Sequence, residues 1–117
     1  MSRRMPELEP RLRFSGSSEA VFGPGKADLL RHIAATGSIS RSAARMKMSY
    51  NRAWTLVREM NHLFSDPLVA AVRGGISGGG ASLTRMGKEV LLRYTRMQWA
   101  CRKATRLDWA FLRRKLR

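Results

Sequence analysis

The sequence predicts a mainly α-helical fold that contains a small amount of β-structure. Apolar residues recur at helical spacing within residues 24–36, 40–63 and 85–117, and this spacing indicates helices that bury one face. Shorter alternating runs, bounded by glycine and serine, lie before and between these segments and favour strands. A chain of 117 residues is long enough for one domain, or for one domain with an appended helix.

The stretch from Gly37 to Leu63 contains two helical patterns that meet near residues 46–48. We expect Ser40 to cap the first helix and Ser49 to cap the second, because a serine oxygen accepts a hydrogen bond from a free N–H group of the first turn. A short helix, a tight turn and a longer helix describe a helix-turn-helix, whose second helix enters the major groove of DNA. An ordinary helical hairpin with a solvated face is the alternative that this stretch leaves open.

The second helix of this pair has two different sides at about 100° per residue. Its apolar side carries Ala53, Val57, Met60 and Phe64, with Tyr50 and Trp54 at the edge. Its polar side carries Asn51, Thr55, Arg58 and His62, flanked by Arg52 and Glu59. The polar side therefore offers hydrogen-bond donors and positive charge to a partner.

The composition is strongly basic, with 23 Lys and Arg against 8 Asp and Glu and a formal net charge of +15. Such a charge favours association with nucleic acid or with an anionic membrane surface. The basic residues are spread along the chain and do not form a tail on a neutral body. A ribosomal or purely architectural protein would fit the charge equally well.

Few residues are available for catalysis or for metal binding. Cys101 is the only cysteine, so the chain can form neither an internal disulfide nor a cysteine-based metal cluster. The two histidines, His32 and His62, lack other ligands to complete a metal shell. Neither paired carboxylates nor an activated nucleophile stands out, so we expect no cofactor and no enzymatic activity. The start of the chain lacks the apolar run of a signal peptide, and with no 18-residue apolar run elsewhere we expect a cytoplasmic protein.

Residues 1–10 are polar and contain two prolines, and we expect them to be mobile. Residues 11–15 and 19–23 predict a small β-hairpin around a turn at residues 16–18. Pro24 suits the first position of a helix, where its missing N–H group is harmless. Gly37 suits the left-handed conformation that ends this helix. The helix between them is expected to support the helix-turn-helix.

Residues 68–73 and 81–84 predict two further strands, joined by a loop that contains five glycines. Glycine permits positive φ and lets a backbone approach a partner closely. A strand, a glycine-rich loop and a strand directly after the second helix predict a wing, with Arg73 at its base. Residues 11–84 would then form a winged helix-turn-helix DNA-binding domain. A loosely ordered hairpin is the alternative.

Residues 85–117 predict a long basic amphipathic helix capped by Thr84, although the sequence leaves its continuity open. A helix of 25 residues or more spans roughly 40 Å at about 1.5 Å per residue, which is longer than so small a domain can cover. Part of the apolar face, including Trp99 and Trp109, therefore needs another chain, and we expect a homodimer. The expected dimer contacts are Tyr94, Met97, Cys101 and Phe111. A basic amphipathic helix lying on a membrane is the weaker alternative.

Several short motifs occur together in a fixed order. They are Gly37-Ser38-Ile39-Ser40, Ser49-Tyr50, Ala53-Trp54, Glu59-Met60-Asn61, Gly74-Gly75, Gly78-Gly79-Gly80-Ala81, Leu83-Thr84 and Gly87. In this order and spacing the chain resembles, over residues 11–96, the N-terminal DNA-binding domain of the molybdate-dependent transcriptional regulators (ModE type). The resemblance implies a winged helix-turn-helix that binds a palindromic operator as a dimer. It also implies target genes for molybdate uptake and molybdenum enzymes.

The chain departs from the family pattern in three places, and each departure affects which family properties we expect of it. Full-length members carry C-terminal oxyanion-binding modules, whereas 33 residues follow Thr84 here, so we expect no molybdate binding by this chain. Lys47 occupies a turn position often filled by glycine, and a left-handed turn there would cost about 1 kcal/mol. Asn51 stands where the family commonly has a basic residue, and asparagine can bond adenine through two hydrogen bonds. The operator preference is therefore expected to differ.

The sequence as a whole predicts a sequence-specific DNA-binding transcriptional regulator with no effector domain of its own. Base edges or nearby phosphates would be contacted by Asn51, Arg52, Thr55 and Arg58. The DNA backbone would be positioned by Ser40, Arg41, Ser49 and Tyr50. The wing would contribute Arg73 and Ser77. A basic architectural or RNA-binding protein without sequence preference is the alternative.

Overall fold

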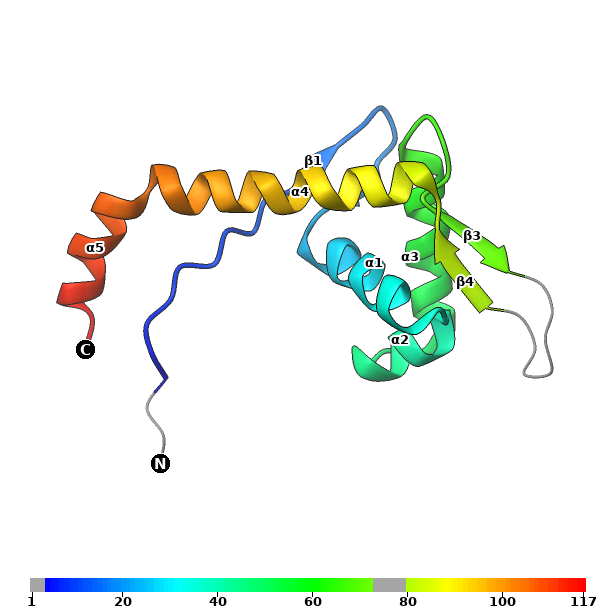
Figure 1. Ribbon diagram of the computed structural model, residues 1–117, viewed down its shortest axis with the longest axis horizontal. Helices are drawn as coiled ribbons and strands as arrows, with labels where there is room; N and C mark the ends of the chain where they lie inside the picture. The colour runs from blue at the N-terminus through cyan, green and yellow to red at the C-terminus, as the bar shows by residue number, and fades with distance from the viewer. Residues whose placement is uncertain (1–3, 73–79) are drawn as a thin grey trace.

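The computed structural model describes residues 4–72 and 80–117. These residues form five helices and four short strands, so the fold is mainly α with small β, as the sequence predicts (Figure 1). The elements in chain order are β1 (Phe14–Ser15), β2 (Val21–Phe22), α1 (Pro24–Thr36), α2 (Ile39–Arg45), α3 (Tyr50–Leu63), β3 (Val69–Val72), β4 (Gly80–Leu83), α4 (Arg85–Ala104) and α5 (Arg106–Lys115). Three helices followed by a two-stranded hairpin make the architecture that of a winged helix.

Helix α1 forms the centre of the domain, because it packs against α2, α3 and α4. Pro24 occupies its first turn, and Gly37 ends it at φ 68° with its N–H bonded to the Ile33 carbonyl, both as predicted. Leu29, Leu30 and Ile33 are fully buried along its inner side. Apolar residues from α2, α3, both hairpins and α4 complete a single hydrophobic core around them.

Ser38, and not Ser40, caps α2. The Ser38 side chain accepts a hydrogen bond from the Arg41 N–H group at 3.0 Å, while Ser40 lies exposed inside the first turn. Both serines satisfy the local capping pattern, and tertiary packing decides between them. Ile39 is buried as the first residue of α2, so the cap position falls to the residue before it.

The turn between α2 and α3 depends on Lys47. Lys47 adopts φ 56°, the left-handed conformation expected for this position, and the Met48 N–H group then bonds to the Ala43 carbonyl at 3.0 Å. Ser49 caps α3 as predicted by accepting a hydrogen bond from Arg52 N–H at 3.0 Å. Helix α3 buries the side predicted from the sequence, together with Leu56: Ala53, Leu56, Val57 and Met60.

Two antiparallel hairpins flank the three helices. The first pairs Phe14 with Phe22, and its strands are shorter than the predicted runs. Its rings join an aromatic cluster in which Phe22 lies 5.8 Å from Phe64 and 5.3 Å from Tyr94 between ring centroids. The second hairpin pairs β3 with β4 from Val69 opposite Leu83 onward. It provides the two strands of the predicted wing, whereas residues 73–79 lie outside the described residues.

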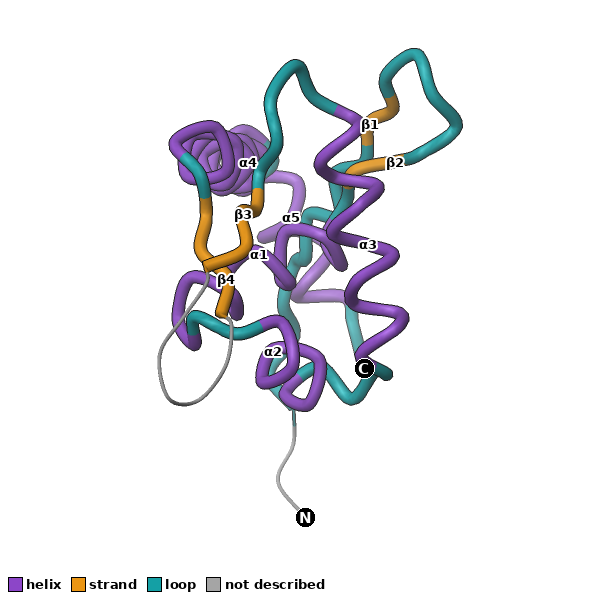
Figure 2. The backbone as a smooth tube through the Cα atoms, turned by 90° about the vertical axis from the view of Figure 1, so that its right-hand side faces the viewer, coloured by secondary structure: helices purple, strands orange, loops and turns teal. Residues whose placement is uncertain are grey.

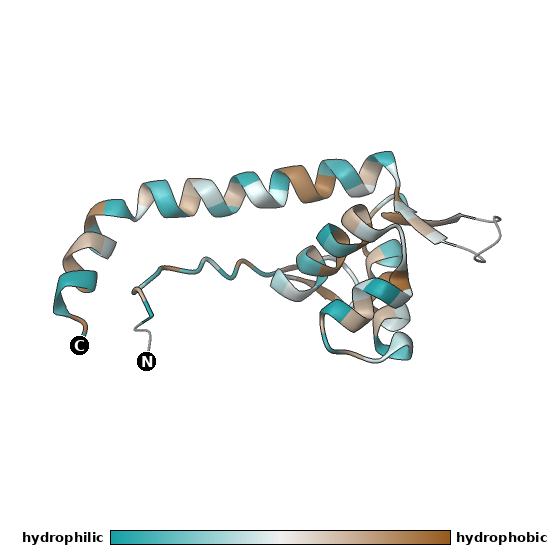
Figure 3. Cartoon of the chain, turned by 60° about the horizontal axis from the view of Figure 1, so that its bottom comes forward, coloured by the Kyte–Doolittle hydropathy of each residue, from teal (hydrophilic) through white to brown (hydrophobic). Residues whose placement is uncertain are grey.

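The C-terminal segment is two helices and not one. Helix α4 begins at the Thr84 cap, whose side chain accepts a hydrogen bond from Gly87 N–H at 3.0 Å, and it ends at Ala104. Thr105 then separates α4 from α5, and its hydroxyl donates to the Cys101 carbonyl at 2.6 Å. Side-chain bonds of this kind from threonine bend helices. Figures 1 and 3 show α5 turning away from the axis of α4, at the end that extends beyond the helical body.

The chain just before β1 is docked on α4 at Pro10, while the mobility expected of residues 1–10 stays a prediction. Pro10 is buried, and its carbonyl accepts a hydrogen bond from Gln98 on α4 at 3.2 Å. The Leu12 carbonyl accepts a bond from the Tyr94 hydroxyl at 2.8 Å. Because both partners come from the last third of the sequence, no local pattern indicates this docking.

Candidate nucleic-acid interface

The exposed side of α3 carries the polar residues that the sequence assigns to DNA contact. Asn51, Arg52 and Arg58 are exposed, and Thr55 is half-buried. Neither arginine forms an ion pair with another of the described residues, so both guanidinium groups can bond to a partner. The Thr55 hydroxyl donates to the Asn51 carbonyl at 3.0 Å, which leaves its oxygen as an acceptor. This side can therefore present both donors and acceptors.

The start of α3 and the adjoining turn add exposed polar and basic side chains. Ser40 and Arg41 are exposed in the first turn of α2. Arg45 and Lys47 are exposed at the turn itself, and our sequence-based site did not include them. Their position between two predicted helices was the available signal. Figure 2 shows α2 packed beside α3, so these groups extend the polar surface of α3.

Two of the predicted contact residues at the start of α3 also have structural roles. The Ser49 oxygen accepts the capping bond from Arg52 N–H, so its hydroxyl hydrogen and one further lone pair remain for a partner. Tyr50 is 50% exposed and packs edge-on against Trp54, with ring centroids 6.3 Å apart. Trp54 is half-buried. Its ring therefore supports Tyr50 at the border between the core and the exposed side of α3.

Glu59 carries the negative charge nearest to this surface, and an ion pair within the domain neutralises it. Its carboxylate lies 2.8 Å from the ammonium group of Lys26 on α1. Lys26 is only 8% exposed and also donates to the Val21 carbonyl. An unpaired carboxylate on α3 would repel the phosphates of a nucleic acid. The Lys26–Glu59 ion pair therefore preserves the attraction of α3 for an anion. The residues of this pair are 33 positions apart, and the sequence did not indicate it.

A shallow groove runs between the β1–β2 hairpin, the start of α1 and α3. Its walls include Arg11, Arg13 and Arg52, together with Glu19 and Glu59. Arg11 is paired with Glu9 at 3.3 Å, and Glu59 is paired as described above. The first hairpin contributes charges of both signs to this groove, Arg13 and Glu19, so among the described residues the unpaired positive charge on its α3 wall is that of Arg52.

The base of the wing is attached to α3 through Asn61. The side-chain oxygen of Asn61 accepts hydrogen bonds from the N–H groups of Leu68 at 2.8 Å and Val69 at 3.0 Å. Its amide nitrogen donates to the Val69 carbonyl at 3.1 Å. The wing therefore begins at a set distance from the last turn of α3. Arg73 and Ser77, which we assigned to wing contacts with DNA, lie outside the described residues.

Two close backbone contacts hold the other side of the wing. A Cβ atom at Gly80 would lie 2.7 Å from the Gly37 carbonyl oxygen, which already accepts a bond from Ala81 N–H at 2.9 Å. A Cβ atom at Gly87 would lie 2.1 Å from the Leu68 carbonyl oxygen. Real Cβ atoms are not found so close to a backbone oxygen, so both positions require glycine. These contacts explain several motif residues as structural.

The residues that we expected at a dimer contact fall into different environments. Tyr94 is 1% exposed in the core of its own domain, so it offers no surface to a second chain. Burial raises the pKa of Tyr94, and its hydroxyl remains a donor to Leu12. Met97 is exposed on α4 and Cys101 is partly exposed. Phe111 is exposed on α5, beyond the bend at Thr105, with the Lys115 ammonium 5.6 Å from its ring centroid.

Trp99, which the sequence places on the part of the apolar face that needs another chain, is 71% exposed. Further exposed apolar residues occur on α4, on α5 and just after α5: Leu92, Leu107, Leu112 and Leu116. A search of the described residues finds neither a helix able to cross a membrane nor a cluster of three metal-ligating side chains.

Comparison with curated proteins identifies the relatives of this domain. The chain is 45% identical over 71 residues to the DNA-binding transcriptional dual regulator ModE of Escherichia coli, which is 61% of this chain and 27% of that protein. It is 43% identical over 75 residues to the molybdenum-pterin-binding protein MopB of Rhodobacter capsulatus, covering 64% of this chain and 28% of that protein. MopA of the same organism is 37% identical over 82 residues, or 70% of this chain and 31% of MopA.

No protein-family model matches the chain, and it spans less than a third of the length of the curated relatives it matches. The identities are nevertheless too high for chance over a stretch of this length. They agree with the helix-turn-helix, the hairpin and the glycine contacts described above. The matched stretch is therefore similar in sequence to the ModE-type regulators, and the described residues have the architecture of a winged helix.

Proposed function

We propose that this chain is a sequence-specific DNA-binding domain of a transcriptional regulator. The observation that carries this proposal is the exposed side of α3, where Asn51 is exposed and Arg52 and Arg58 form no ion pair with other described residues. Arginine and asparagine are the side chains that bond guanine and adenine through paired hydrogen bonds in the major groove. The ModE relative, named a DNA-binding regulator, supports the same role.

The remaining candidate residues would position the DNA. Contacts to phosphates or base edges by Asn51, Arg52, Thr55 and Arg58 come from α3 itself. Backbone phosphates would be bound by Ser40, Arg41, Ser49 and Tyr50, next to the start of α3. We add Arg45 and Lys47 to these, because their exposed charges adjoin the turn. Arg73 and Ser77 remain proposed wing contacts.

We further propose that two chains associate through α4 and α5. Contiguous exposed apolar surface is uncommon on a monomer and marks an interface, and Met97, Trp99 and Phe111 are all exposed here. A two-fold dimer would set two α3 helices about one DNA turn apart, roughly 34 Å, and would match a palindromic operator. Tyr94 takes no part in this contact.

The names of the relatives suggest the genes that such a regulator controls. One is a molybdenum transport protein ModE of Azotobacter vinelandii, 40% identical over 70 residues. We propose that the operators of this chain lie at genes of molybdenum homeostasis. Binding of molybdate by these 117 residues is not part of the proposal, because the resemblance covers a DNA-binding domain.

Selection of bound fragments from genomic DNA tests the proposed function. The selected fragments should share a palindrome, and the chain should bind that palindrome about 10³-fold or more tightly than random DNA at the same salt concentration. Equal affinity for selected and random DNA would contradict sequence-specific recognition. That result, or tighter binding to RNA, would support the architectural or RNA-binding alternative.

A further inference from the structure

Helix α4 is attached to the domain at three successive levels. Near its start, Gly87 lies against the Leu68 carbonyl. Two turns later Tyr94 is buried against Phe22. The third level is polar, and it lies at Thr95 and Gln98. No residue of α4 after Gln98 belongs to the hydrophobic core of the described residues, so the polar level is where the helix leaves the body of the domain.

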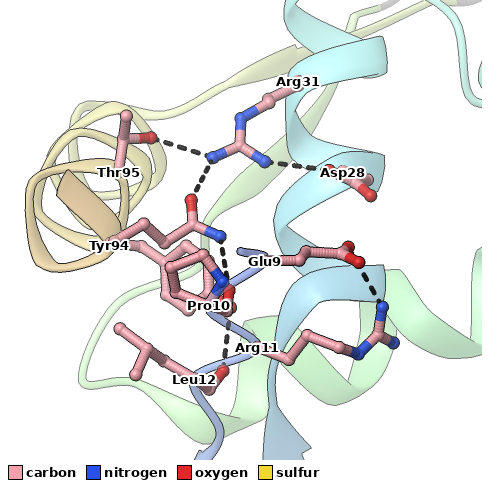
Figure 4. Close-up of polar contacts among 9 residues, drawn as sticks. Glu9, Pro10, Arg11, Leu12, Asp28, Arg31, Tyr94 and Thr95 are labelled. Atoms are coloured by element: carbon pink, nitrogen blue, oxygen red, sulfur yellow. Dashed lines mark hydrogen bonds and ion pairs between the residues drawn. The ribbon is translucent and has the colours of Figure 1, made fainter. Parts of the chain in front are cut away.

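The polar level is a clamp made by Arg31, Thr95 and Gln98, which we call the α1–α4 clamp (Figure 4). One nitrogen of the Arg31 guanidinium donates to the Thr95 hydroxyl at 3.0 Å and to the Gln98 side-chain oxygen at 3.1 Å. The other nitrogen donates to Asp28 on α1 at 2.8 Å. The Gln98 amide then donates to the Pro10 carbonyl at 3.2 Å. The clamp therefore ties α4 both to α1 and to the segment before β1.

The chemistry of the clamp makes it directional. Apolar contacts such as the packing of the Tyr94 ring against Phe22 are non-directional, and the Tyr94 hydroxyl adds one bond to the Leu12 carbonyl, which lies before β1 and not on α1. A guanidinium is planar and holds its donors in a rigid fork. Because the fork of Arg31 is already held by Asp28 from its own helix, it restricts the direction in which Thr95 and Gln98 can lie.

We infer that Arg31 and Gln98 are positioning residues that set the angle between α4 and the DNA-contacting body, and thereby the half-site spacing that the protein accepts. The inference rests on the proposed function, in which α4 carries the dimer contact and α3 contacts the operator. On this view, the two α3 helices of a dimer are related through two copies of the clamp. Neither residue needs to touch DNA.

A small rotation of α4 relative to the domain, at the clamp, would change the distance between the two α3 helices of the dimer. Helix α3 lies one helix beyond α1 as seen from α4 (Figure 2), and packed helices are about 8–10 Å apart, so the lever from α4 to α3 is roughly 20 Å. A rotation of about 10° at that radius displaces α3 by roughly 3.5 Å, which is about the rise of one base pair. If loss of the clamp permits rotations of this size, the dimer will accept half-sites at more than one spacing.

Three variants test the inference in the 117-residue chain. Arg31→Ala removes the fork, and Gln98→Ala removes the bonds to Arg31 and Pro10 without changing charge. Arg93→Ala is the matched control, because Arg93 lies on the same helix and pairs only with Glu89 of that helix among the described residues. Affinity is measured for the selected palindrome, for palindromes with one or two base pairs added or removed at the centre, and for a single half-site.

We expect the wild-type chain and Arg93→Ala to lose about tenfold or more when one base pair is added, since an added pair moves and rotates one half-site relative to the other. Arg31→Ala and Gln98→Ala should bind palindromes of every spacing with affinities within about threefold of one another. That spread corresponds to a difference in binding free energy of less than about 1 kcal/mol. Their affinity for a single half-site should match that of the wild type. Circular dichroism and thermal unfolding confirm that each variant is folded.

Two results would overturn the inference while leaving the proposed function intact. One is a wild-type spacing preference that both variants retain. The other is an affinity loss in Arg31→Ala that is equal for all DNAs, including the single half-site, and absent in Gln98→Ala, which would make Arg31 a phosphate contact. A wild-type chain without any spacing preference would instead contradict the proposed dimeric recognition, and the inference with it.

Discussion

The side chain of Asn61 lies where the backbone of another strand would otherwise bond to Leu68 and Val69. Its three hydrogen bonds satisfy two N–H groups and one carbonyl at the base of the wing. An unsatisfied buried polar group costs about 1–3 kcal/mol. We therefore predict that Asn61→Ala lowers the free energy of unfolding by about 2 kcal/mol or more, as measured by urea denaturation. Asn51→Ala is the control in the same helix, where an exposed site should change stability by about 0.5 kcal/mol or less. Equal losses in the two variants would contradict this role.

A single methyl group distinguishes two helical glycines. At Gly87 the new Cβ atom of an alanine would meet the Leu68 carbonyl oxygen at 2.1 Å, whereas at Gly25 it would meet nothing within 4 Å. Alanine is favoured over glycine inside a helix by about 1 kcal/mol. We predict that Gly25→Ala leaves the thermal unfolding midpoint unchanged or raises it, and that Gly87→Ala lowers it because α4 must move away from β3. A higher midpoint for Gly87→Ala would show that this contact is not tight.

Two arginines on α3 provide the test of the DNA surface at residue scale. Arg52 and Arg58 are exposed, so their replacement by alanine should leave the unfolding midpoint unchanged. A lost phosphate contact should reduce the slope of log affinity against log salt by about one unit, and a lost base contact should relax specificity by about 1–3 kcal/mol. The measurement is operator affinity at several salt concentrations, with Arg93→Ala as control. Wild-type affinity and slope in both variants would exclude this side of α3.

At the scale of elements, the ends of helices could be predicted wherever the signal is local. Pro24, Gly37, Ser49 and Thr84 all stand where the sequence places them, because a cap depends on the residues of one turn. Ser40 was the error. Two serines matched the same pattern, and the burial of Ile39 selected Ser38.

Features that depend on distant residues could not be predicted. The Lys26–Glu59 pair, the docking of Pro10 and the burial of Tyr94 each join elements that are far apart in the sequence. Periodicity placed Tyr94 on an apolar stripe, but it could not say which part of the stripe the domain itself covers. For the same reason, the sequence could predict which polar residues lie on α3. It could not predict the bonds of Asn61 to the base of the wing or the ion pair of Glu59 with Lys26.

Helix α5 can be tested as a separable element. It buries no residue, and it follows the bend at Thr105. We predict that a chain ending at Thr105 keeps the wild-type unfolding midpoint of the domain at low concentration but associates more weakly, because it loses Phe111 and the other apolar side chains of α5. Sedimentation over a range of concentrations measures this difference. Undiminished association would place the dimer contact on α4 alone, and Leu92→Ala and Met97→Ala would then be the variants to compare.

Charge dominates the behaviour of the molecule as a whole. Two chains of formal charge +15 repel each other, and eleven of the 23 basic residues lie in 85–117, against Glu89 and Asp108. Salt screens this repulsion over about 8–10 Å. Added salt also weakens DNA binding, because it opposes the release of counterions from the DNA. We predict opposite responses: raising the salt concentration from about 0.05 to 0.5 M should strengthen self-association and weaken operator binding. Sedimentation and operator titration at the same two concentrations measure them. Self-association that weakens with salt would indicate an interface held by ion pairs.

The bond from the Tyr94 hydroxyl to the Leu12 carbonyl spans 82 residues, and this has a consequence for synthesis of the chain. At roughly 5–20 residues per second, a ribosome adds Tyr94 about 4–16 seconds after Leu12. Throughout that interval Phe22 lacks the Tyr94 ring that packs edge-on against it in the finished domain. The first hairpin must therefore wait on the nascent chain with part of its aromatic cluster uncovered until Tyr94 has been made.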